Sequence, residues 1–265
     1  MSNIESNGSP MVGLSALKDL NISLIISDVD DTITSNGKLK PNALEAMYKA
    51  SEKGYRIILL SGGSAGWCEV YLRQWPIFMV VAESGAVMIY KDENGQIRYQ
   101  QNPIITKENL DSRDKLLRMI GEERLSSDQY ARLYDIAVDL SKVNEKELND
   151  IKSMADVMGA SYAQSSIHLN IWFGDYSKSK GLLAFMNLCG IDEETLKEES
   201  IYLGDALNDE EMFKLIPNSI GMKSVLDKKE EFKTLPKYIS SYYGGDGFAE
   251  ALDNLKKIKK YFITL

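Results

Sequence analysis

The sequence of 265 residues has little histidine or cysteine: one histidine, His168, and two cysteines, Cys68 and Cys189, with no CxxC pair. One histidine rules out a histidine-rich metal site and argues against a Ser-His-Asp triad. Two distant cysteines do not make a disulfide framework, so we expect reduced structural thiols in a cytoplasmic protein.

Long apolar runs and an excess of positive charge are also missing. No apolar run approaches the roughly 20 residues that a bilayer-spanning helix needs, so no membrane partner is expected. Residues 1–10 lack the basic and apolar regions of a signal peptide. The formal net charge of -8 argues against nucleic acid as a partner, because duplexes bind basic faces. The composition, 44% hydrophobic and 26% charged, is that of a soluble globular protein.

One stretch, residues 24–34, combines a short apolar run with an acidic end. The run is followed by Asp28, Asp30, Asp31 and Thr32. It predicts a strand buried in a parallel sheet, with the carboxylates just past its carboxyl end, where such sheets bind ligands. Two carboxylates there suit Mg²⁺, and they also suit a nucleophile paired with an acid–base group. The alternative is an ordinary Asp-rich turn after a strand.

The elements expected on either side of the middle of the chain alternate between strand and helix. This pattern predicts an α/β fold with a doubly wound parallel sheet and right-handed crossovers. The expected strands are residues 24–28, 55–60, 78–82, 200–203, 218–222 and 238–241, and the expected helices are residues 41–54, 65–75, 180–188, 208–215 and 247–259.

The middle of the chain has a different pattern, which predicts an inserted α+β domain. Asn94-Gly95 lies between two strand-like runs and is a strong hairpin signal. Further strands are expected at residues 133–140 and 166–173, and helices at residues 106–123 and 145–158. We therefore expect a core made of residues 1–86 and 175–265 and an insert made of residues 87–174.

Polar residues at other strand ends complete a possible site. Ser61 and Gly62 follow one predicted strand, and Asp205, Asn208 and Asp209 follow another; Lys180 begins a helix. In a doubly wound sheet these positions face one edge. Acids, a hydroxyl and a lysine together suit phosphoryl transfer, with Mg²⁺ offsetting phosphate charge. Taken singly, Lys180 could be a solvated lysine and Asn208-Asp209 a helix cap.

Four of these segments resemble, in order, the motifs of the haloacid dehalogenase (HAD) superfamily. The segments are Asp28-Val29-Asp30-Asp31-Thr32, Ser61 after an apolar strand, Ser179-Lys180-Gly181, and Gly204-Asp205-Ala206-Leu207-Asn208-Asp209. The place of the insert, between the second and third motifs, resembles a class II, type B (Cof-like) cap. Glu83-Ser84-Gly85-Ala86 resembles the turn that leads into such caps.

The resemblance implies a role for each matched residue. Asp28 is implied to attack phosphorus, and Asp30 to protonate the leaving oxygen and then activate water. Ser61 and Lys180 are implied to hold the phosphoryl group. The implied Mg²⁺ ligands are Asp28, the Asp30 main-chain carbonyl, Asp205 and, in support, Asp209; Thr32, Gly62 and Asn208 are assigned to phosphate binding.

The chain departs from the family pattern at two positions. Asp31 stands where many members have glycine, and we expect its side chain to point away from the site or to cap a helix. Ser61-Gly62-Gly63 replaces the frequent Thr-Gly-Arg, which removes a possible phosphate or substrate contact. In the predicted strand 166–173, His168 and Asn170 lie on a polar face that either looks onto the substrate or is simply solvated.

The function expected from these features is Mg²⁺-dependent hydrolysis of a phosphomonoester through an aspartyl-phosphate. The expected substrate is a small phosphorylated metabolite, favouring a sugar phosphate, and the expected assembly is a monomer or homodimer. Two alternatives stay open: a phosphomutase of the same superfamily, and a non-catalytic protein that binds a phosphometabolite.

Overall fold

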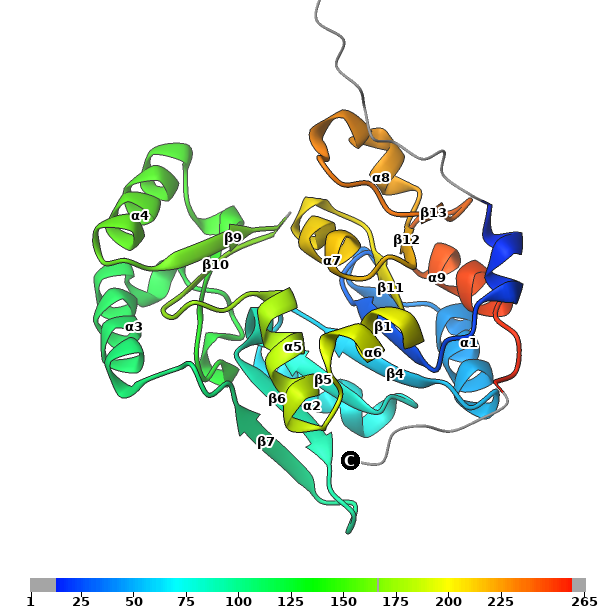
Figure 1. The fold of residues 1–265 in the computed structure, drawn as a ribbon. Coiled ribbons are helices and arrows are strands. Elements are labelled where there is room, and N and C mark those ends of the chain that lie inside the picture. Colours follow the sequence, from blue (N-terminus) through cyan, green and yellow to red (C-terminus); the bar gives the residue numbers. More distant parts are fainter. Residues whose placement is uncertain (1–12, 166, 259–265) are drawn as a thin grey trace, which may run out of the picture. The chain divides into compact units, whose positions relative to one another are not determined.

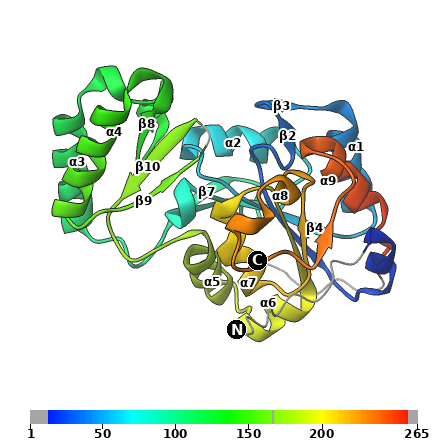
Figure 2. The same cartoon turned by 90° about the horizontal axis from the view of Figure 1, so that it is seen from above.

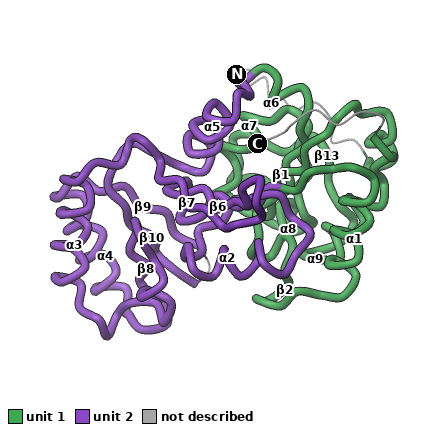
Figure 3. Tube along the Cα trace, turned by 90° about the horizontal axis from the view of Figure 1, so that it is seen from below, with its two compact units in different colours: residues 1–57, 194–264 green, residues 58–193, 265 purple. Residues whose placement is uncertain are grey.

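The computed structural model describes residues 13–165 and 167–258. The predictions for residues 1–10 and for Ser166 therefore lie outside the described residues. The helix predicted for residues 247–259 was wrong at its end: α9 (Gly244–Asp253) ends before residues 254–258, which are described and not helical. The chain forms two compact units, shown in different colours in Figure 3. Described residues up to Ile57 and from Glu194 onward form the first unit, and Ile58–Glu193 form the second.

The first unit contains a parallel sheet in the strand order β13-β12-β11-β1 (Figure 1). All five residues of β1 are buried, which confirms the predicted buried strand and explains its apolar run. Neighbouring β1 and β11 pair in parallel from Leu24 with Ser200 to Ser27 with Leu203, so both end at the same edge. The strands are β1 (Leu24–Asp28), β11 (Ser200–Gly204), β12 (Ser219–Gly221) and β13 (Tyr238–Ile239).

Helices and a small hairpin complete the first unit. The predicted helix starting at Pro41 is α1 (Pro41–Glu52), with proline in its first turn, and it packs against α9 (Gly244–Asp253). The other strands and α-helices are β2 (Thr34–Ser35), β3 (Lys38–Leu39), α6 (Glu193–Glu199, which begins at the boundary between the units), α7 (Glu210–Leu215) and α8 (Ser224–Asp227).

The second unit contains a mixed sheet. β4 (Arg56–Leu60) begins in the first unit and continues into the second, where it pairs in parallel with β5 (Met79–Ala82). The predicted hairpin forms β6 (Val87–Lys91) and β7 (Ile97–Gln101). β6 pairs antiparallel with β5, so the hairpin extends this sheet.

A second, three-stranded sheet in the order β8-β10-β9 also belongs to the second unit. Figures 1 and 2 show α3 and α4 side by side on one face of it, where Leu116, Ile151, Leu169 and other apolar side chains form a core. Capping boxes at Thr106 and Asn144 begin the two helices. The elements are α3 (Lys107–Ile120), β8 (Ile136–Asp139), α4 (Glu145–Val157), β9 (Ser161–Gln164) and β10 (His168–Trp172).

Two further helices of the second unit begin at serine caps. Ser64 accepts a hydrogen bond from Trp67 N at the start of α2 (Ala65–Gln74), and Ser177 accepts one from Lys180 N in α5 (Lys178–Leu188). The chain thus has a doubly wound α/β fold with an added α+β part. The division at residues 87 and 174 stays a prediction. In the part of the chain that the structure describes, no helix has both the length and the apolar character to cross a membrane.

Candidate active site

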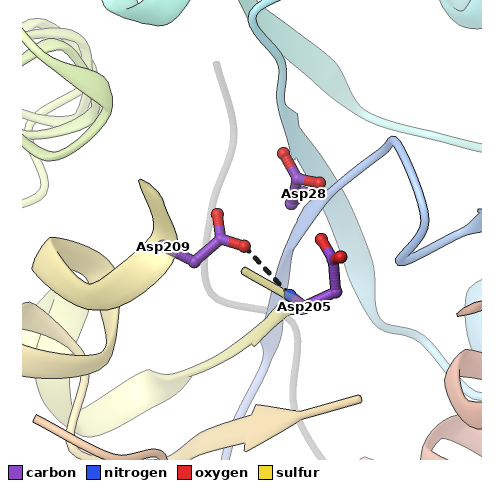
Figure 4. A group of neighbouring side chains, drawn as sticks. All are labelled: Asp28, Asp205 and Asp209. Carbon is purple, nitrogen blue, oxygen red and sulfur yellow. Dashed lines mark hydrogen bonds between the residues drawn. The ribbon is translucent and has the colours of Figure 1, made fainter. Parts of the chain in front are cut away.

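Three carboxylates meet in the first unit, as Figure 4 shows. Asp28 is the last residue of β1, whereas Asp205 and Asp209 follow the adjacent strand β11. One ligand oxygen from each lies within 4.8 Å of the others. Because β1 and β11 are parallel neighbours, their ends bring together residues 177 positions apart in the chain. The structure therefore brings together three of the four predicted metal ligands, and the fourth, the Asp30 main-chain carbonyl, stays a prediction.

The Asp209 side chain is held firmly in this group. Its Oδ1 accepts a hydrogen bond from the Tyr202 hydroxyl at 2.6 Å, and its Oδ2 accepts from Asp205 N at 2.9 Å and Ala206 N at 3.3 Å. Burial, and then the charges of Asp209 and Asp28, raise the pKa of Tyr202, so its hydroxyl stays protonated and donates. A side chain at Gly204 would place its Cβ 2.6 Å from Asp209 Oδ2, which explains the glycine there.

The other predicted residues of the first unit differ in how close they come to this group. Thr32 is buried, and its hydroxyl donates to Asp205 Oδ1 at 3.3 Å. Asp30 and Asn208 are exposed, and the Asp30 carboxylate is not one of the three that meet. Asp31 is exposed too; it points to the β2–β3 turn, where its Oδ1 accepts from Asn36 N at 2.8 Å. The Asp31 side chain thus points away from the three carboxylates, which was one of the two expectations, and this hydrogen bond does not cap a helix.

The three carboxylates fit a divalent cation. They offer hard oxygen ligands from Asp28, Asp205 and Asp209, which is the donor type that Mg²⁺ prefers. Asp28 and Asp209 are buried, and holding several like charges in a buried position is unfavourable without a compensating charge. A bound cation would offset this repulsion, so these residues are the ones that could hold Mg²⁺.

In the second unit, Ser61 and Gly62 form a tight turn directly after β4. Ser61 is buried, and its Oγ accepts a hydrogen bond from Gly63 N at 2.9 Å. A Cβ at Gly63 would lie 3.0 Å from that Oγ. A side chain at residue 63 would therefore fit tightly, and the serine hydroxyl would have to shift by a few tenths of an ångström.

Lys180 lies at the start of α5, and its side chain is exposed and paired with Asp175. The helix start packs closely on the turn formed by Glu83–Gly85, because a Cβ at Gly181 would lie only 2.5 Å from Gly85 Cα. Within the Glu83–Gly85 turn, Ser84 N donates a hydrogen bond to Ser61 O at 3.1 Å. The beginning of α5 and the Ser61 turn are therefore joined through one intermediate turn, while the role of Lys180 stays a prediction.

The Glu83–Gly85 turn is backbone-strained and built around a buried acid. Glu83 and Ser84 have φ values of 49° and 56°, which are uncommon for residues other than glycine. The fully buried Glu83 carboxylate accepts hydrogen bonds from four main-chain N–H groups. The donors are Ala65 at 2.9 Å, Leu133 at 2.9 Å, Tyr134 at 2.7 Å and Asp135 at 3.1 Å. These hydrogen bonds hold the turn in place, so its strained backbone conformation is retained.

Burial, followed by the charge of Asp135, raises the pKa of Glu83 to about 7. The folded state then binds more protons than the unfolded state between the ordinary pKa of 4.5 and that value, so this group's contribution to stability falls as pH rises through the interval. In the Glu83→Gln variant the residue has no ionisable group, so this contribution to the pH dependence of stability is absent. We expect the stability difference between wild type and Glu83→Gln, measured by urea unfolding, to shrink by about 2 kcal/mol between pH 5 and pH 8. A difference that grows with pH would contradict this assignment.

The polar face predicted for residues 166–173 is not solvated along β10; a solvated face was one of the two interpretations of its alternating pattern. Asn170 is 7% exposed and Trp172 is 6% exposed, while His168 is half-buried. Asn170 Nδ2 donates to Gly62 O at 3.0 Å, so this face touches the Ser61 turn. Arg132, which the sequence did not single out, donates to the same carbonyl at 3.0 Å. Arg132 lies in a polar loop, where no periodicity marks a buried residue.

Comparisons with known proteins show what this chain is similar to. A sequence model of the family described as haloacid dehalogenase-like hydrolase matches residues 25–117 and 104–252. No curated protein sequence matches the chain.

Similar solved structures include a Thermoplasma acidophilum protein (TM-score 0.69, 18% identity, 88% of this chain and 97% of that one). Another is a phosphatase of the haloalkanoate (HAD) enzyme superfamily from Bacteroides thetaiotaomicron (TM-score 0.62, 17% identity, 88% and 94%). A third is a trehalose-6-phosphate phosphatase related protein (TM-score 0.59, 17% identity, 87% and 96%).

Proposed function

Because the chain belongs to the haloacid dehalogenase-like hydrolases, we propose that it is a Mg²⁺-dependent phosphatase that hydrolyses a small phosphomonoester. The observation that carries the proposal is the meeting of Asp28, Asp205 and Asp209, with Thr32 bonded to Asp205. A nucleophilic carboxylate beside two others that can hold a cation is what transfer of a phosphoryl group to aspartate requires.

In the proposed mechanism, an Asp28 oxygen attacks phosphorus and the ester bond to the leaving oxygen breaks. Asp30 gives a proton to that leaving oxygen. Asp30 is exposed in the structure, so solvent can reach it, and in the second step it takes a proton from the attacking water. Water then attacks the aspartyl-phosphate, which releases inorganic phosphate and regenerates Asp28. Bound Mg²⁺ supplies positive charge that offsets the phosphate oxygens.

The phosphoryl oxygens need further partners, and the sequence predicts candidates for them. We assign Ser61 Oγ and the Gly62 N–H as hydrogen-bond donors and Lys180 as a positive charge. Lys180 pairs with the exposed Asp175 in the structure, so in this proposal its ammonium exchanges that partner for the phosphate. An exposed pair of this kind is worth about 0–1 kcal/mol, so the exchange costs little.

We propose a sugar phosphate as the substrate class. One structurally similar protein is a trehalose-6-phosphate phosphatase related protein, although identity of 17% supports the fold and not the substrate. Glycine at 63 leaves no side chain for a substrate contact, so selectivity depends on other residues. Half-buried His168 is the residue we assign to that role, whereas exposed Asn208 keeps its assignment to phosphate binding.

Hydrolysis of p-nitrophenyl phosphate, followed by a screen of sugar phosphates for released inorganic phosphate, tests the proposal. We expect turnover with Mg²⁺, loss of at least about 100-fold on addition of EDTA, and recovery when Mg²⁺ is restored. Absence of turnover with every phosphoester and divalent ion would favour a binding protein. Transfer of labelled phosphate between two positions of one sugar, without release, would favour a phosphomutase.

A further inference from the structure

The carbonyl oxygens of the turn at Ser61, Gly62 and Gly63 all accept hydrogen bonds. Ser61 O accepts from Ser84 N at 3.1 Å, and Gly63 O accepts from Glu83 N at 3.2 Å. Gly62 O accepts two side-chain bonds, from Arg132 Nη1 and Asn170 Nδ2, both at 3.0 Å. A turn with flexible glycines is thus held at every carbonyl.

Holding the carbonyls also sets the direction of the N–H groups. In a planar trans peptide the N–H points opposite to the C=O that precedes it. The N–H of Gly62 therefore points away from Ser84, and the N–H of Gly63 points away from Arg132 and Asn170. The direction of the Gly63 N–H is confirmed by its own hydrogen bond, which it donates to Ser61 Oγ. Main-chain N–H groups and hydroxyls oriented in this way can bind an anion. Because the Gly63 N–H holds Ser61 Oγ, the donors that we assign to an anion are the Gly62 N–H and the Ser61 hydroxyl.

Arg132 can hold this carbonyl because carboxylates on either side fix its guanidinium. Nη1 contacts both oxygens of Asp135, at 2.9 and 3.0 Å, and Nη2 contacts Asp128 at 3.3 Å. Asn170 Nδ2 also donates to Asp135, at 2.8 Å. Arg132, Asp135 and Asn170 are all buried. The fork of donors on arginine suits this simultaneous bonding, which a single ammonium cannot reproduce.

We propose that Arg132 and Asn170 are positioning residues for phosphate binding, acting through the Gly62 carbonyl to orient the turn at Ser61. This inference rests on the proposed phosphatase function and goes beyond it, because it places determinants of phosphate affinity on the predicted insert. The chain has Gly63 where the family frequently has arginine, and here Arg132, 70 positions from Gly62, donates a hydrogen bond to the Gly62 carbonyl.

The test compares Arg132→Lys and Asn170→Ala with wild type. Arg132→Lys keeps a positive charge beside Asp135 but cannot also hold Gly62 O and Asp128. We expect the inhibition constant of inorganic phosphate and the KM for p-nitrophenyl phosphate to rise about tenfold, equivalent to about 1.4 kcal/mol. The Mg²⁺ concentration for half-maximal activity should stay within about twofold of wild type. General destabilisation of the fold would change both the phosphate constant and the Mg²⁺ requirement, whereas a positioning role changes only the phosphate constant.

Arg113→Lys is the matched control. Arg113 donates to the main-chain carbonyls of Arg132 and Asp135 at 3.2–3.3 Å, so it supports the same loop without touching Gly62. Its phosphate constant should equal that of wild type. Should Arg132→Lys fail to fold, Asn170→Ala carries the test, since it leaves the ion pairs of Arg132 in place.

The outcomes separate the two proposals. An active wild type whose folded Arg132→Lys and Asn170→Ala variants bind phosphate normally would overturn the positioning role alone. A wild type inactive on p-nitrophenyl phosphate with every divalent ion would instead overturn the proposed function, and this inference with it.

Discussion

Replacing Asp28 with asparagine is expected to lower turnover of p-nitrophenyl phosphate by at least about 10⁴-fold, the range seen when an enzyme loses its nucleophile. An amide oxygen is a poor nucleophile, and the change also removes one of three carboxylates that could hold Mg²⁺. Asp28 is buried at the end of β1, and asparagine has nearly the same shape, so the fold should be retained. Initial rates at saturating Mg²⁺, with circular dichroism as a check on folding, measure the effect.

Asp31→Asn provides the matched control for this prediction. Asp31 belongs to the same motif and carries the same charge, but it is exposed and bonds to Asn36 N in the β2–β3 turn. Surface substitutions of this kind usually change little, so turnover should stay within about threefold of wild type. If Asp28→Asn keeps more than about a tenth of wild-type turnover, Asp28 is not the nucleophile.

Asp205→Asn should chiefly weaken Mg²⁺ binding. Asp205 follows β11 next to Asp28 and Asp209, and replacing its carboxylate removes one negative charge from the group. We expect the Mg²⁺ concentration for half-maximal activity to rise about 100-fold, with much of kcat recovered at saturating metal. A titration of activity against Mg²⁺ at fixed substrate gives both constants.

Tyr202→Phe gives a graded comparison for the metal site. The phenol donates to Asp209 Oδ1, so its loss should loosen a supporting carboxylate and raise the Mg²⁺ requirement about tenfold. Asp31→Asn should leave the requirement unchanged. An Asp205→Asn enzyme with the Mg²⁺ dependence of wild type would exclude Asp205 from the metal site.

The parts of the structure that the sequence revealed are those with a strong local pattern. β1 and β11 are short apolar runs ended by acids, and the strand ends place Asp28 and Asp205 together. Pro41 begins α1, and Asn94-Gly95 turns the β6–β7 hairpin, because these residues have marked backbone preferences. Each of these features depends on a few consecutive residues.

The features that the sequence did not reveal depend on contacts between distant residues. Asn170 and Gly62 are 108 positions apart, and alternation along β10 cannot show which face another segment covers. Arg132 lies in a polar loop, yet it is buried and forms an ion pair with Asp135. Strand β9 is mostly exposed and polar, so it lacks the apolar signal of a strand.

The residues that we assign to the proposed chemistry are divided between the two units. The carboxylates that could hold Mg²⁺ belong to the first unit, and the turn at Ser61 with the start of α5 belongs to the second. The insert residues Arg132 and Asn170 act within the second unit, on the turn assigned to phosphate.

A crystal structure of the protein with Mg²⁺ and orthovanadate tests this arrangement most directly, because vanadate adopts the geometry of a phosphoryl group in transfer. The account predicts vanadium bonded to an Asp28 oxygen, Mg²⁺ on Asp28 and Asp205, and vanadate oxygens contacting Ser61 and Lys180. Vanadate bound away from Asp28, or held there with Ser61 and Lys180 out of reach, would contradict it.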